Sequence, residues 1–581
     1  MTQAADAKAR LILDDAWAIA RRTPFIFRQV AGGLGTLPDL SPEGVEATAA
    51  TARDLLGRID ALDLDQLPST LSAPLRQARY SADIWSRADT WYWTVIDPGG
   101  VGFYGMFLPS PYCGGIILNF AFDTLAHMPL DEPDDLDRYL DLCTGLAVML
   151  EQWRARTVGQ AARGMLMPRA QIPTARGLLA AFAERSISLA DLGDNRFADT
   201  MRHLAPAFRE TVRQRIVEAI QPAFASVADV FDLGYESAAP ESVGLSQYEG
   251  GADIYRHLVR IHTTMDLTPE EVHDLGRTRL QSIEADMRRI RAEAGFADDP
   301  AGYVAAVFSN PRFRAANSSD VTVAFQRYID RMDVELPRAF HAGPLAPFDV
   351  APLPVAMQGG MTFGYYEPPG PGRDEGRFHF NSTHLTSTPL LGLASLTYHE
   401  LVPGHHFHFA TQNSNDRLHP ISRHAFCNAF NEGWAEYAAT LAGELGCYAD
   451  PAESFGRYAM EAFLTCRLVV DTGMNALGWS LDEAREFMRA HTTMSDAEID
   501  SETLRYSCDV PAQALAYKLG EPALLSLRED MRSALQARGR ELDLRDFHEA
   551  VLAFGAMPLP DLEHEVGRRL LATSTTSEGT A

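Results

Sequence analysis

Long stretches of the chain alternate apolar and polar residues with the repeat of an α-helix. Apolar residues recur at positions i, i+3 and i+4 in EPDDLDRYLDLCTGLAVMLEQWRARTVG (132–159), and a second such stretch covers 200–231. This spacing places the apolar side chains on one face of a helix, where other helices can bury them. The same rhythm begins at about residue 6. We therefore predict a mainly α fold with an N-terminal helical region over residues 1–245.

The helical rhythm stops between about residues 345 and 385, where proline and glycine are dense. Three short runs separated by turns lie there: VAPLPVAM (350–357), TFGYYEPP (362–369) and GRFHFNST (376–383). Apolar and aromatic runs between turn residues are typical of strands. We predict a small β-sheet whose edge can hold an extended peptide by main-chain hydrogen bonds. The sheet belongs to a second predicted region, 246–572, and the polar tail 573–581 is expected to be disordered.

The segment LTYHELVPGHHFHF (396–409) concentrates metal-binding residue types in an apolar, helix-like frame. In zinc hydrolases of the H-E-x-x-H type, two histidines four residues apart lie on one helix face and the glutamate is the general base. Here the fourth residue after His399 is Pro403, so the standard motif is absent. Pro403 has no N–H and crowds the carbonyl of His399, while Gly404 tolerates unusual backbone angles. We predict a bulge of about two residues, which returns His405 to the face of His399.

This reasoning makes His399 and His405 candidate metal ligands and Glu400 the candidate general base. His406 points the same way in an undistorted helix but lies roughly 10 Å along the axis, so it is the alternative second ligand. A proline-kinked helix with hydrogen-bonded histidines is the interpretation without a metal. An adjacent His-Glu pair in an apolar run is costly unless it has a function, which favours the metal site.

A third ligand is expected from the next helical stretch, AFNEGWAEYAATLAGEL (429–445). Glu432 lies early in this stretch, and Glu436 lies one turn further along the same face. One carboxylate can bind the metal while the other orients a ligand histidine. In isolation either glutamate is more often a solvated helix residue. Because they follow HELVPGHH, we predict Glu432 as the third ligand and Glu436 as the orienting residue.

Two later segments supply candidates for contact with a substrate. Arg467 and Asp471 lie one helical turn apart and can form a structural ion pair or grip a substrate carboxylate. The segment RYSCDVPAQALAYKLG supplies the other candidates, Arg505, Tyr506, Gln513 and Tyr517. Attack on a carbonyl needs a hydrogen-bond donor for the developing oxyanion, and Tyr506 and Tyr517 are the candidates. We predict Arg467, Arg505 and Gln513 as substrate-binding residues and Asp471 as a supporting residue behind the site.

HELVPGHHFH followed by NEGWAEYA resembles the bacterial family known as domain of unknown function 885, marked by His-Glu-x-x-Pro-Gly-His and Glu-Gly-Trp-Ala. The NEG segment is also similar to the one that supplies the glutamate ligand in aminopeptidase-N-like zinc peptidases. Further similar segments extend over most of the chain: GRFHFNSTHL, RLVVDTGMNALGWSLDEAREFM, RYSCDVPAQALAYKLGEPALLSLRED and FHEAVLAFGAMPLPDLE. The resemblance implies a large helical, gluzincin-type fold, with metal ligands His399, His405 and Glu432 and with Glu400 as general base.

The chain departs from this family's pattern in two places. The family tends to carry a histidine in the DTG-x-H segment, where this chain has Asn475. It also tends to read Trp-Pro-Gly-Gln-Ala where this chain has Val-Pro-Ala-Gln-Ala at 510–514. Both departures lie outside the predicted ligands. They therefore bear on substrate identity and turnover more than on metal binding.

Composition excludes several classes of partner. The chain has 581 residues, a formal net charge of −27 and a sequence pI of about 5.0, which argue against nucleic acid or an anionic membrane. No apolar run reaches the roughly 18 to 20 residues of a membrane span, and the N-terminus lacks a signal-peptide pattern. Six cysteines are scattered without CxxC pairing, as is typical of reduced, mostly buried thiols. We predict a cytoplasmic protein.

Together these features predict a zinc-dependent hydrolase that binds one Zn²⁺ per chain and cleaves peptide or amide bonds in short peptides. One alternative is a specialised tailoring enzyme that acts on a small amide or peptide-like metabolite at the same metal site, and Asn475 and Ala512 make it plausible. Another is a non-catalytic binding protein on the same fold, against which the intact Glu400 speaks. The sequence leaves open the substrate, the direction of cleavage and the oligomeric state.

Overall fold

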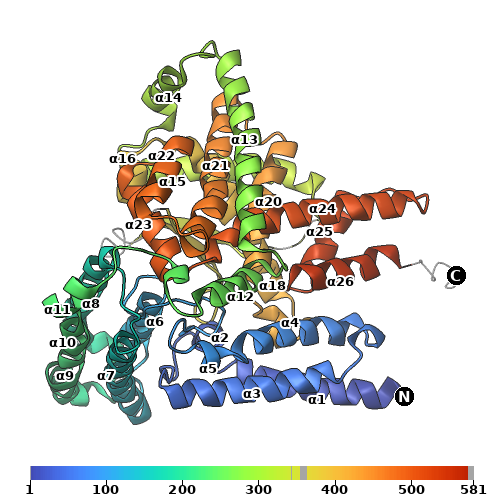
Figure 1. Ribbon diagram of the computed structural model, residues 1–581. Coiled ribbons are helices and arrows are strands. Elements are labelled where there is room, and N and C mark those ends of the chain that lie inside the picture. Colours follow the sequence, from blue (N-terminus) through green and yellow to red (C-terminus); the bar gives the residue numbers. More distant parts are fainter. Residues whose placement is uncertain (1, 342, 344, 354–362, 573–581) are drawn as a thin grey trace.

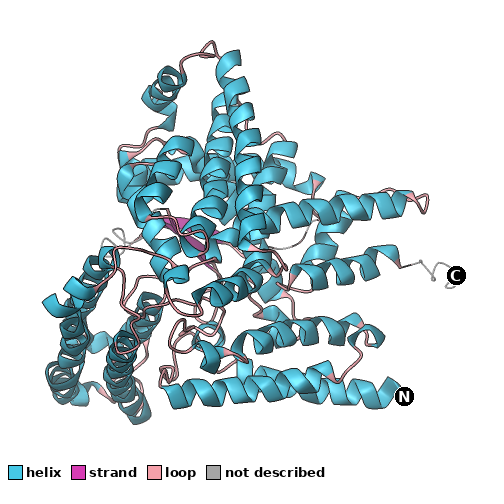
Figure 2. Cartoon of the chain, viewed as in Figure 1, coloured by secondary structure: helices cyan, strands magenta, loops and turns pink. Residues whose placement is uncertain are grey.

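The computed structural model describes residues 2–341, 343, 345–353 and 363–572. The chain is mainly helical, with a three-stranded sheet near the middle of the molecule (Figure 2). The prediction of a mainly α fold with a small sheet is confirmed. All six cysteines are buried and unpaired, as predicted. Within the described part of the chain, no helix combines the length and apolar character needed to cross a membrane. The predicted tail, 573–581, lies outside the described residues.

The N-terminal part of the chain is built from helices that occupy the lower half of Figure 1. They are α1 (Thr2–Ala20), α2 (Pro24–Ala31), α3 (Pro42–Asp60), α4 (Ser69–Trp85), α5 (Ala88–Trp91), α6 (Gly114–His127), α7 (Pro133–Ala161), α8 (Ile172–Arg185), α9 (Ala205–Arg215), α10 (Gln221–Ala228) and α11 (Leu233–Ala238). Helix α7 realises the predicted run 132–159. It begins in a capping box, in which the side chains of Glu132 and Asp135 accept hydrogen bonds from the first-turn backbone.

The C-terminal part adds a second set of helices around the sheet. They are α12 (Gly251–Thr263), α13 (Pro269–Glu293), α14 (Pro300–Ser309), α15 (Ser318–Glu335), α16 (Ser382–Ser387), α17 (Leu393–Glu400), α18 (His405–Ser414), α19 (Pro420–Arg423), α20 (Asn428–Glu444), α21 (Pro451–Asn475), α22 (Leu481–His491), α23 (Asp496–Leu504), α24 (Ala516–Gln536), α25 (Leu544–Leu552) and α26 (Leu559–Leu571). Helices α13 and α21 pack along each other in the upper half of Figure 1. Helix α21 carries Arg467, and α23 continues into a π-helical turn, Arg505–Asp509.

Helices α20 and α24 approach each other unusually closely, at two facing glycines. A Cβ atom added to Gly433 would lie 2.6 Å from the Cα atom of Gly520, and one added to Gly520 would lie 2.7 Å from the Cα atom of Gly433. Side chains larger than hydrogen would therefore push the helices apart. The contact brings Tyr517 and Lys518 of α24 beside the helix that carries Glu432.

The sheet has the strand order β1-β3-β2. Strand β1 (Phe348–Pro352) is parallel to β3 (Gly376–Phe380), and β2 (Gly364–Glu367) is antiparallel to β3. Strands β2 and β3 lie within the second and third predicted runs, whereas β1 begins two residues before the first run and shares only residues 350–352 with it; residues 354–362 lie outside the described part. The central strand β3 buries Phe378 and Phe380 against Phe325 of α15. This packing fixes the sheet beside α17 and α18.

The apolar core joins the two predicted regions. Its largest cluster contains Tyr139 and Leu146 from the first region together with Leu258 and Leu519 from the second. The division at residue 245 marks no break in this cluster. It stays a prediction about the organisation of the sequence.

Candidate metal centre

The predicted bulge is a complete break between two helices. Helix α17 ends at Glu400 and α18 begins at His405, so LVPG connects them. The Val402–Pro403 bond is cis, and the N–H of Phe407 donates to the carbonyl of Leu401 at 3.2 Å. A Cβ atom added to Gly404 would collide with the carbonyl oxygen of His399. The short connection therefore needs glycine at this position, and it turns His405 back toward His399.

Two histidines and a glutamate meet at this break. The Nε2 atoms of His399 and His405 lie 3.7 and 3.4 Å from Oε2 of Glu432, which comes from α20. One ligand atom from each of the three residues lies within 4.8 Å of the other two. The two imidazole rings are nearly perpendicular, at 86°, with centroids 4.8 Å apart. Donor atoms from three different helices thus converge on one point.

The chemistry of these donors fits a zinc ion. Oε2 of Glu432 is buried and has no hydrogen-bond partner among the described residues. Nδ1 of His399 lies 2.9 Å from Oε1 of Glu436, which accepts its hydrogen and leaves Nε2 as a lone-pair donor toward Glu432. Two imidazoles and one carboxylate, with room for a fourth group, are the donor set of catalytic zinc sites. The three residues present would suit that ion.

His406 follows His405 directly, but both of its ring nitrogens form hydrogen bonds to other residues. Its Nδ1 is 2.8 Å from the hydroxyl of Tyr366 on β2, and its Nε2 is 2.9 Å from the carbonyl oxygen of Ala346. Both ring nitrogens are therefore engaged in tying α18 to the sheet. Of the two alternatives that the sequence left open, the geometry brings His405 and not His406 to the cluster.

Acidic neighbours set the charge of the cluster. Burial works to lower the pKa of His399, but the hydrogen bond to Glu436 and the charge of Glu400 raise it overall. Burial works to raise the pKa of Glu432, but the nearby His405 imidazole, 3.4 Å away, and the charges of both histidines lower it overall. Glu400 itself has a raised pKa because it is buried, although His405 and His399 oppose the shift.

A buried network of charges stands behind His399. The second carboxylate oxygen of Glu436 lies 3.1 Å from Nζ of Lys518 and 3.3 Å from a guanidinium nitrogen of Arg457. Burial raises the pKa of Glu436, yet these two cations hold it well below its usual range. Glu461, Glu521 and Arg279 extend the network through further ion pairs. The predicted orienting role of Glu436 thus has a geometric basis, which extends to residues the sequence did not single out.

A pocket with about 100 Å³ of open space adjoins the cluster. His399 and Glu400 line the pocket beside the cluster. Arg467, Arg505 and Glu502 also line it and form what we call its far end. Tyr517 lines the pocket between them, with its ring stacked on His399 at a centroid distance of 6.0 Å and an angle of 11°. Tyr517, Arg467 and Arg505, three of the predicted site residues, thus line this pocket.

Three other predicted residues lie outside this lining. The hydroxyl of Tyr506 receives a hydrogen bond from Nε of Arg467 at 2.7 Å and donates to Glu502, so it is occupied. Gln513 accepts a hydrogen bond from Arg505 at 2.7 Å and holds that guanidinium in place. Asp471 accepts hydrogen bonds from Tyr255 and from the backbone N–H of Ala512, away from the metal cluster. Of the two candidate tyrosines, Tyr517 lines this pocket and Tyr506 does not.

The ion pair between Arg467 and Asp471, one of the two alternatives for these residues, does not form. Arg467 instead pairs with Glu502 of α23 at 3.1 Å, because the guanidinium turns toward the pocket while Asp471 faces Tyr255. Glu502 has no local signal in the sequence, since an acid in an amphipathic helix is usually solvated. Lys518 does stand out in the sequence, because it and Lys8 are the only lysines and all other basic residues apart from histidine are arginine.

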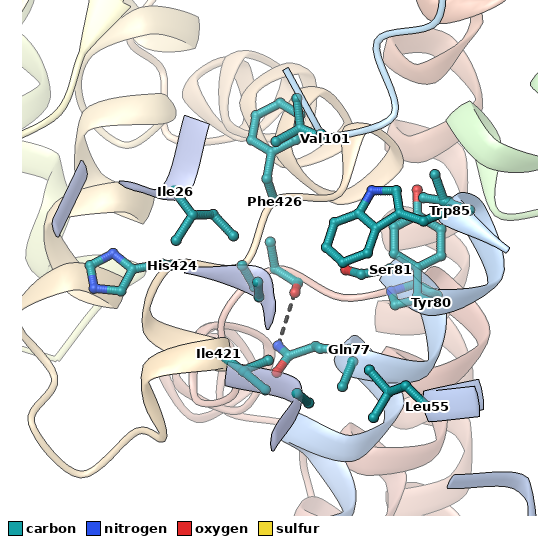
Figure 3. A pocket seen from close by; sticks show the side chains of 18 residues that line it. Ile26, Leu55, Gln77, Tyr80, Ser81, Trp85, Val101, Ile421, His424 and Phe426 are labelled. Atoms are coloured by element: carbon teal, nitrogen blue, oxygen red, sulfur yellow. Dashed lines mark hydrogen bonds between the residues drawn. The ribbon is translucent and has the colours of Figure 1, made fainter. Parts of the chain in front are cut away.

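A second pocket lies apart from this chemistry (Figure 3). It holds about 40 Å³ of open space between the N-terminal helices and the segment that joins α19 to α20. Tyr80 and Trp85 lie on one side and Phe426 above, while Gln77 donates a hydrogen bond to the carbonyl of Ala556 at 2.9 Å (Figure 3). Its lining is mainly apolar and contains none of the three clustered donors. The pocket beside His399 is therefore the one that carries the chemistry.

Comparison with known proteins places this site in a family context. The family model described as "Bacterial protein of unknown function (DUF885)" matches residues 28–566. A structure from Colwellia psychrerythraea, titled as that of a "putative lipoprotein", has a TM-score of 0.81 at 23% identity and covers 97% of this chain and 99% of its own. A second, from Shewanella oneidensis and titled a "putative lipoprotein of unknown function", has a TM-score of 0.68 at 16% identity and covers 96% and 98%.

These two likenesses show a shared fold. No curated protein matches the chain. The family match spans most of the sequence, including the HELVPGH and EGWA segments that form the cluster. The chain is a member of the DUF885 family of bacterial proteins.

Proposed function

We propose that the chain is a zinc-dependent hydrolase of peptide or amide bonds in short peptides, with a gluzincin-type arrangement of its site. The observation that carries the proposal is the convergence of His399, His405 and Glu432, with one ligand atom from each within 4.8 Å of the others. Oε2 of Glu432 is buried without a hydrogen-bond partner among the described residues, and such an atom is costly unless a cation satisfies it. Glu400, next to His399 in sequence, lines the adjoining pocket.

In this proposal His399, His405 and Glu432 hold one zinc ion. Bound zinc supplies a Lewis acid that polarises a carbonyl group and acidifies water. Glu400 takes a proton from the attacking water and returns it to the leaving amine. Tyr517 donates a hydrogen bond to the oxygen on which negative charge develops.

A second candidate is a specialised enzyme for a small amide or peptide-like metabolite at the same site. The modest volume of the pocket, about 100 Å³, favours it. So does the environment of Asn475, which stands where the family tends to have histidine. The side chain of Asn475 accepts from the N–H of Leu245 and donates to the carbonyl of Tyr506, so it shapes the wall behind the pocket.

Metal content of the purified chain tests the proposal. Mass spectrometry should find one zinc per wild-type chain, a loss of zinc in His405→Ala and wild-type content in His406→Ala. His406→Ala is the matched control because it removes a neighbouring imidazole that ties α18 to the sheet. Absence of zinc from the wild type, even after zinc is supplied, would leave the non-catalytic binding protein as the better interpretation.

A further inference from the structure

The end of the pocket away from the metal cluster has an unusual set of charges. Two guanidinium groups, Arg467 and Arg505, face one carboxylate, Glu502, at 3.1 and 3.8 Å. The side chains of Arg467, Arg505 and Glu502 are 5%, 13% and 4% exposed. Among the described residues that line this end, positive charge therefore exceeds negative charge by one in a place with little water. A buried charge of this kind calls for a partner.

The other acids along the pocket do not supply that partner. Glu436 is matched by Lys518 and Arg457 in the network behind His399. Glu400 lies at the opposite end, where the proposed zinc and Glu432 set the charge balance. Asp509 and Asp471 lie close enough to Arg505 to interact with its charge, but neither forms an ion pair with it among the described residues; they accept hydrogen bonds from Ser110 and Tyr255 instead. The excess positive charge among the lining residues thus lies at the end formed by Arg467 and Arg505.

Arg505 is held in a position to receive an anion. Its guanidinium stacks on the ring of Tyr112 with Cζ 4.4 Å from the ring centroid, and one terminal nitrogen donates to Gln513 at 2.7 Å. Its Nε atom is buried and has no hydrogen-bond partner among the described residues. A planar fork with an unsatisfied N–H matches the geometry of a carboxylate, which accepts two parallel hydrogen bonds.

Arg467 stands beside it on the side nearer the metal cluster. Its Cζ lies 4.9 Å from the centroid of the Tyr517 ring, and the same ring stacks on His399 with a centroid distance of 6.0 Å. The guanidinium and a predicted ligand thus both contact one tyrosine ring. One or two residues of extended chain, at about 3.3 to 3.6 Å each, fit between two groups placed this way. The remaining wall is apolar and includes Phe463 and Leu464.

We propose that Arg505 and Arg467 bind the terminal carboxylate of the substrate, while an apolar side chain of the same end packs on the wall at Phe463 and Leu464. This carboxylate site rests on the proposed hydrolase function, and it assigns the direction of cleavage. The bond that reaches the metal cluster lies one or two residues from a free C-terminus. The products are then a shortened acyl portion and an apolar amino acid or dipeptide.

Binding of two matched probes tests the carboxylate site without requiring turnover. Titration calorimetry compares N-acetyl-L-phenylalanine with its amide, which has the same shape but no charge. We expect the acid to bind the wild-type protein at least about tenfold more tightly than the amide. Arg505→Gln should abolish this preference by weakening the acid alone. Glu502→Gln should strengthen binding of the acid, because Glu502 competes with the ligand for the same guanidinium groups.

The opposite signs of these two variants guard against a trivial folding defect, which would weaken binding in both. Arg489→Gln, an exposed arginine on α22, is the matched control and should leave both affinities unchanged. Equal affinity for acid and amide, or no binding of either, would overturn the inference. A preference for the acid that survives in Arg505→Gln would also overturn it, because the carboxylate would then sit on the metal cluster.

Failure of the hydrolase proposal has a different signature. A wild-type chain without zinc that still binds the acid selectively, through Arg505, would support the carboxylate site and remove the catalytic role. A zinc-loaded chain that hydrolyses a peptide and its C-terminal amide equally well would support the hydrolase function and remove the carboxylate site.

Discussion

Nδ1 of His399 donates a hydrogen bond of 2.9 Å to Oε1 of Glu436, and the two residues lie on different helices. This contact fixes the orientation of the imidazole and the nitrogen that remains for a metal. The carboxylate is held in turn by Lys518 and Arg457. An orienting acid of this kind makes the histidine a better ligand, because it stabilises positive charge on the ring.

Glu436→Gln should therefore weaken zinc binding by about 10- to 100-fold without removing a ligand. Competition with a fluorescent zinc chelator measures the affinity. Glu444→Gln, on the exposed end of the same helix, is the matched control and should bind zinc as the wild type does. An unchanged affinity in Glu436→Gln would mean that His399 needs no orientation by this carboxylate, or is not a ligand.

Lys518→Met should lower the free energy of unfolding by about 3 to 5 kcal/mol, because it leaves three glutamates, two of them buried, short of a cation. Nζ of Lys518 lies 3.1 Å from Glu436, 3.3 Å from Glu461 and 2.5 Å from Glu521. Urea unfolding followed by circular dichroism measures the change. Lys8→Met removes the other lysine of the chain, which is exposed on α1, and should stay within about 0.5 kcal/mol of the wild type. Similar small effects in both variants would contradict a structural role for the network.

Ala512→Gly should stabilise the chain by up to about 1 kcal/mol. Ala512 has a φ of 67°, in the left-handed region that favours glycine, and the family tends to have glycine here. The N–H of Ala512 donates to both oxygens of Asp471, so the backbone cannot relax without losing these bonds.

Ala514→Gly is the control for that change, because Ala514 is not among the described non-glycine residues with positive φ. There the greater freedom of glycine in the unfolded chain and the loss of a buried methyl should destabilise the protein. Thermal unfolding of both variants decides the matter. A loss of stability in Ala512→Gly would show that the methyl group of Ala512 contributes more than the backbone angle costs.

Asp471 should make stability fall as the pH rises from about 4 to about 7. Burial raises its pKa from the ordinary 3.8 to about 7, although hydrogen bonds from Tyr255, Ala512 and Asn475 oppose the shift. Between these pH values the folded chain holds a proton that the unfolded chain has lost. The contribution is therefore complete below about pH 4 and declines by at most about 1.4 kcal/mol per pH unit.

Asp471→Asn should remove that decline, so its stability relative to the wild type should improve as the pH rises toward 7. Unfolding curves at pH 4.5, 5.5 and 6.5 measure the difference. Asp482→Asn, at an exposed position on α22, should follow the wild type at every pH. Parallel curves for wild type and Asp471→Asn would show that the carboxyl is ionised in the folded chain throughout.

Glu400→Gln should abolish hydrolysis while zinc remains bound. Removal of a general base lowers turnover by about 10²- to 10⁴-fold, and glutamine keeps the size of the side chain. A peptide with an apolar C-terminal residue is the test substrate, and mass spectrometry reports zinc in the same samples. Turnover by Glu400→Gln close to that of the wild type would remove Glu400 from the mechanism.

Local patterns in the sequence predicted much of the fold and of the candidate metal site. Helical periodicity predicted the long helices such as α7, because the pattern of apolar residues directly reports one buried face. The Pro403–Gly404 pair predicted an interruption that brings His405 near His399, and the structure contains that approach in the form of a full helix break. Dense proline and glycine predicted a small sheet, and three strands are present.

Some pairings between distant segments were not predicted. An ion pair of Arg467 with Asp471, one turn away, was one of two alternatives, but Arg467 pairs with Glu502 from another helix. The choice between Tyr506 and Tyr517 was open in the sequence and depends on which hydroxyl Arg467 and Glu502 already occupy. Neither outcome follows from spacing within one helix.

The sequence by itself determined which residues could bind a metal, and it indicated long helices such as α7 and an interruption of the helix at Pro403. These properties depend on neighbours within a few positions, through backbone sterics and the helical repeat. Only the tertiary structure decided that His399 is the histidine that Glu436 orients, that Lys518 is buried against three acids and that two arginines share one glutamate. Those contacts depend on how α20, α21, α23 and α24 pack, since a buried charge takes as its partner whichever opposite charge the packing brings within reach.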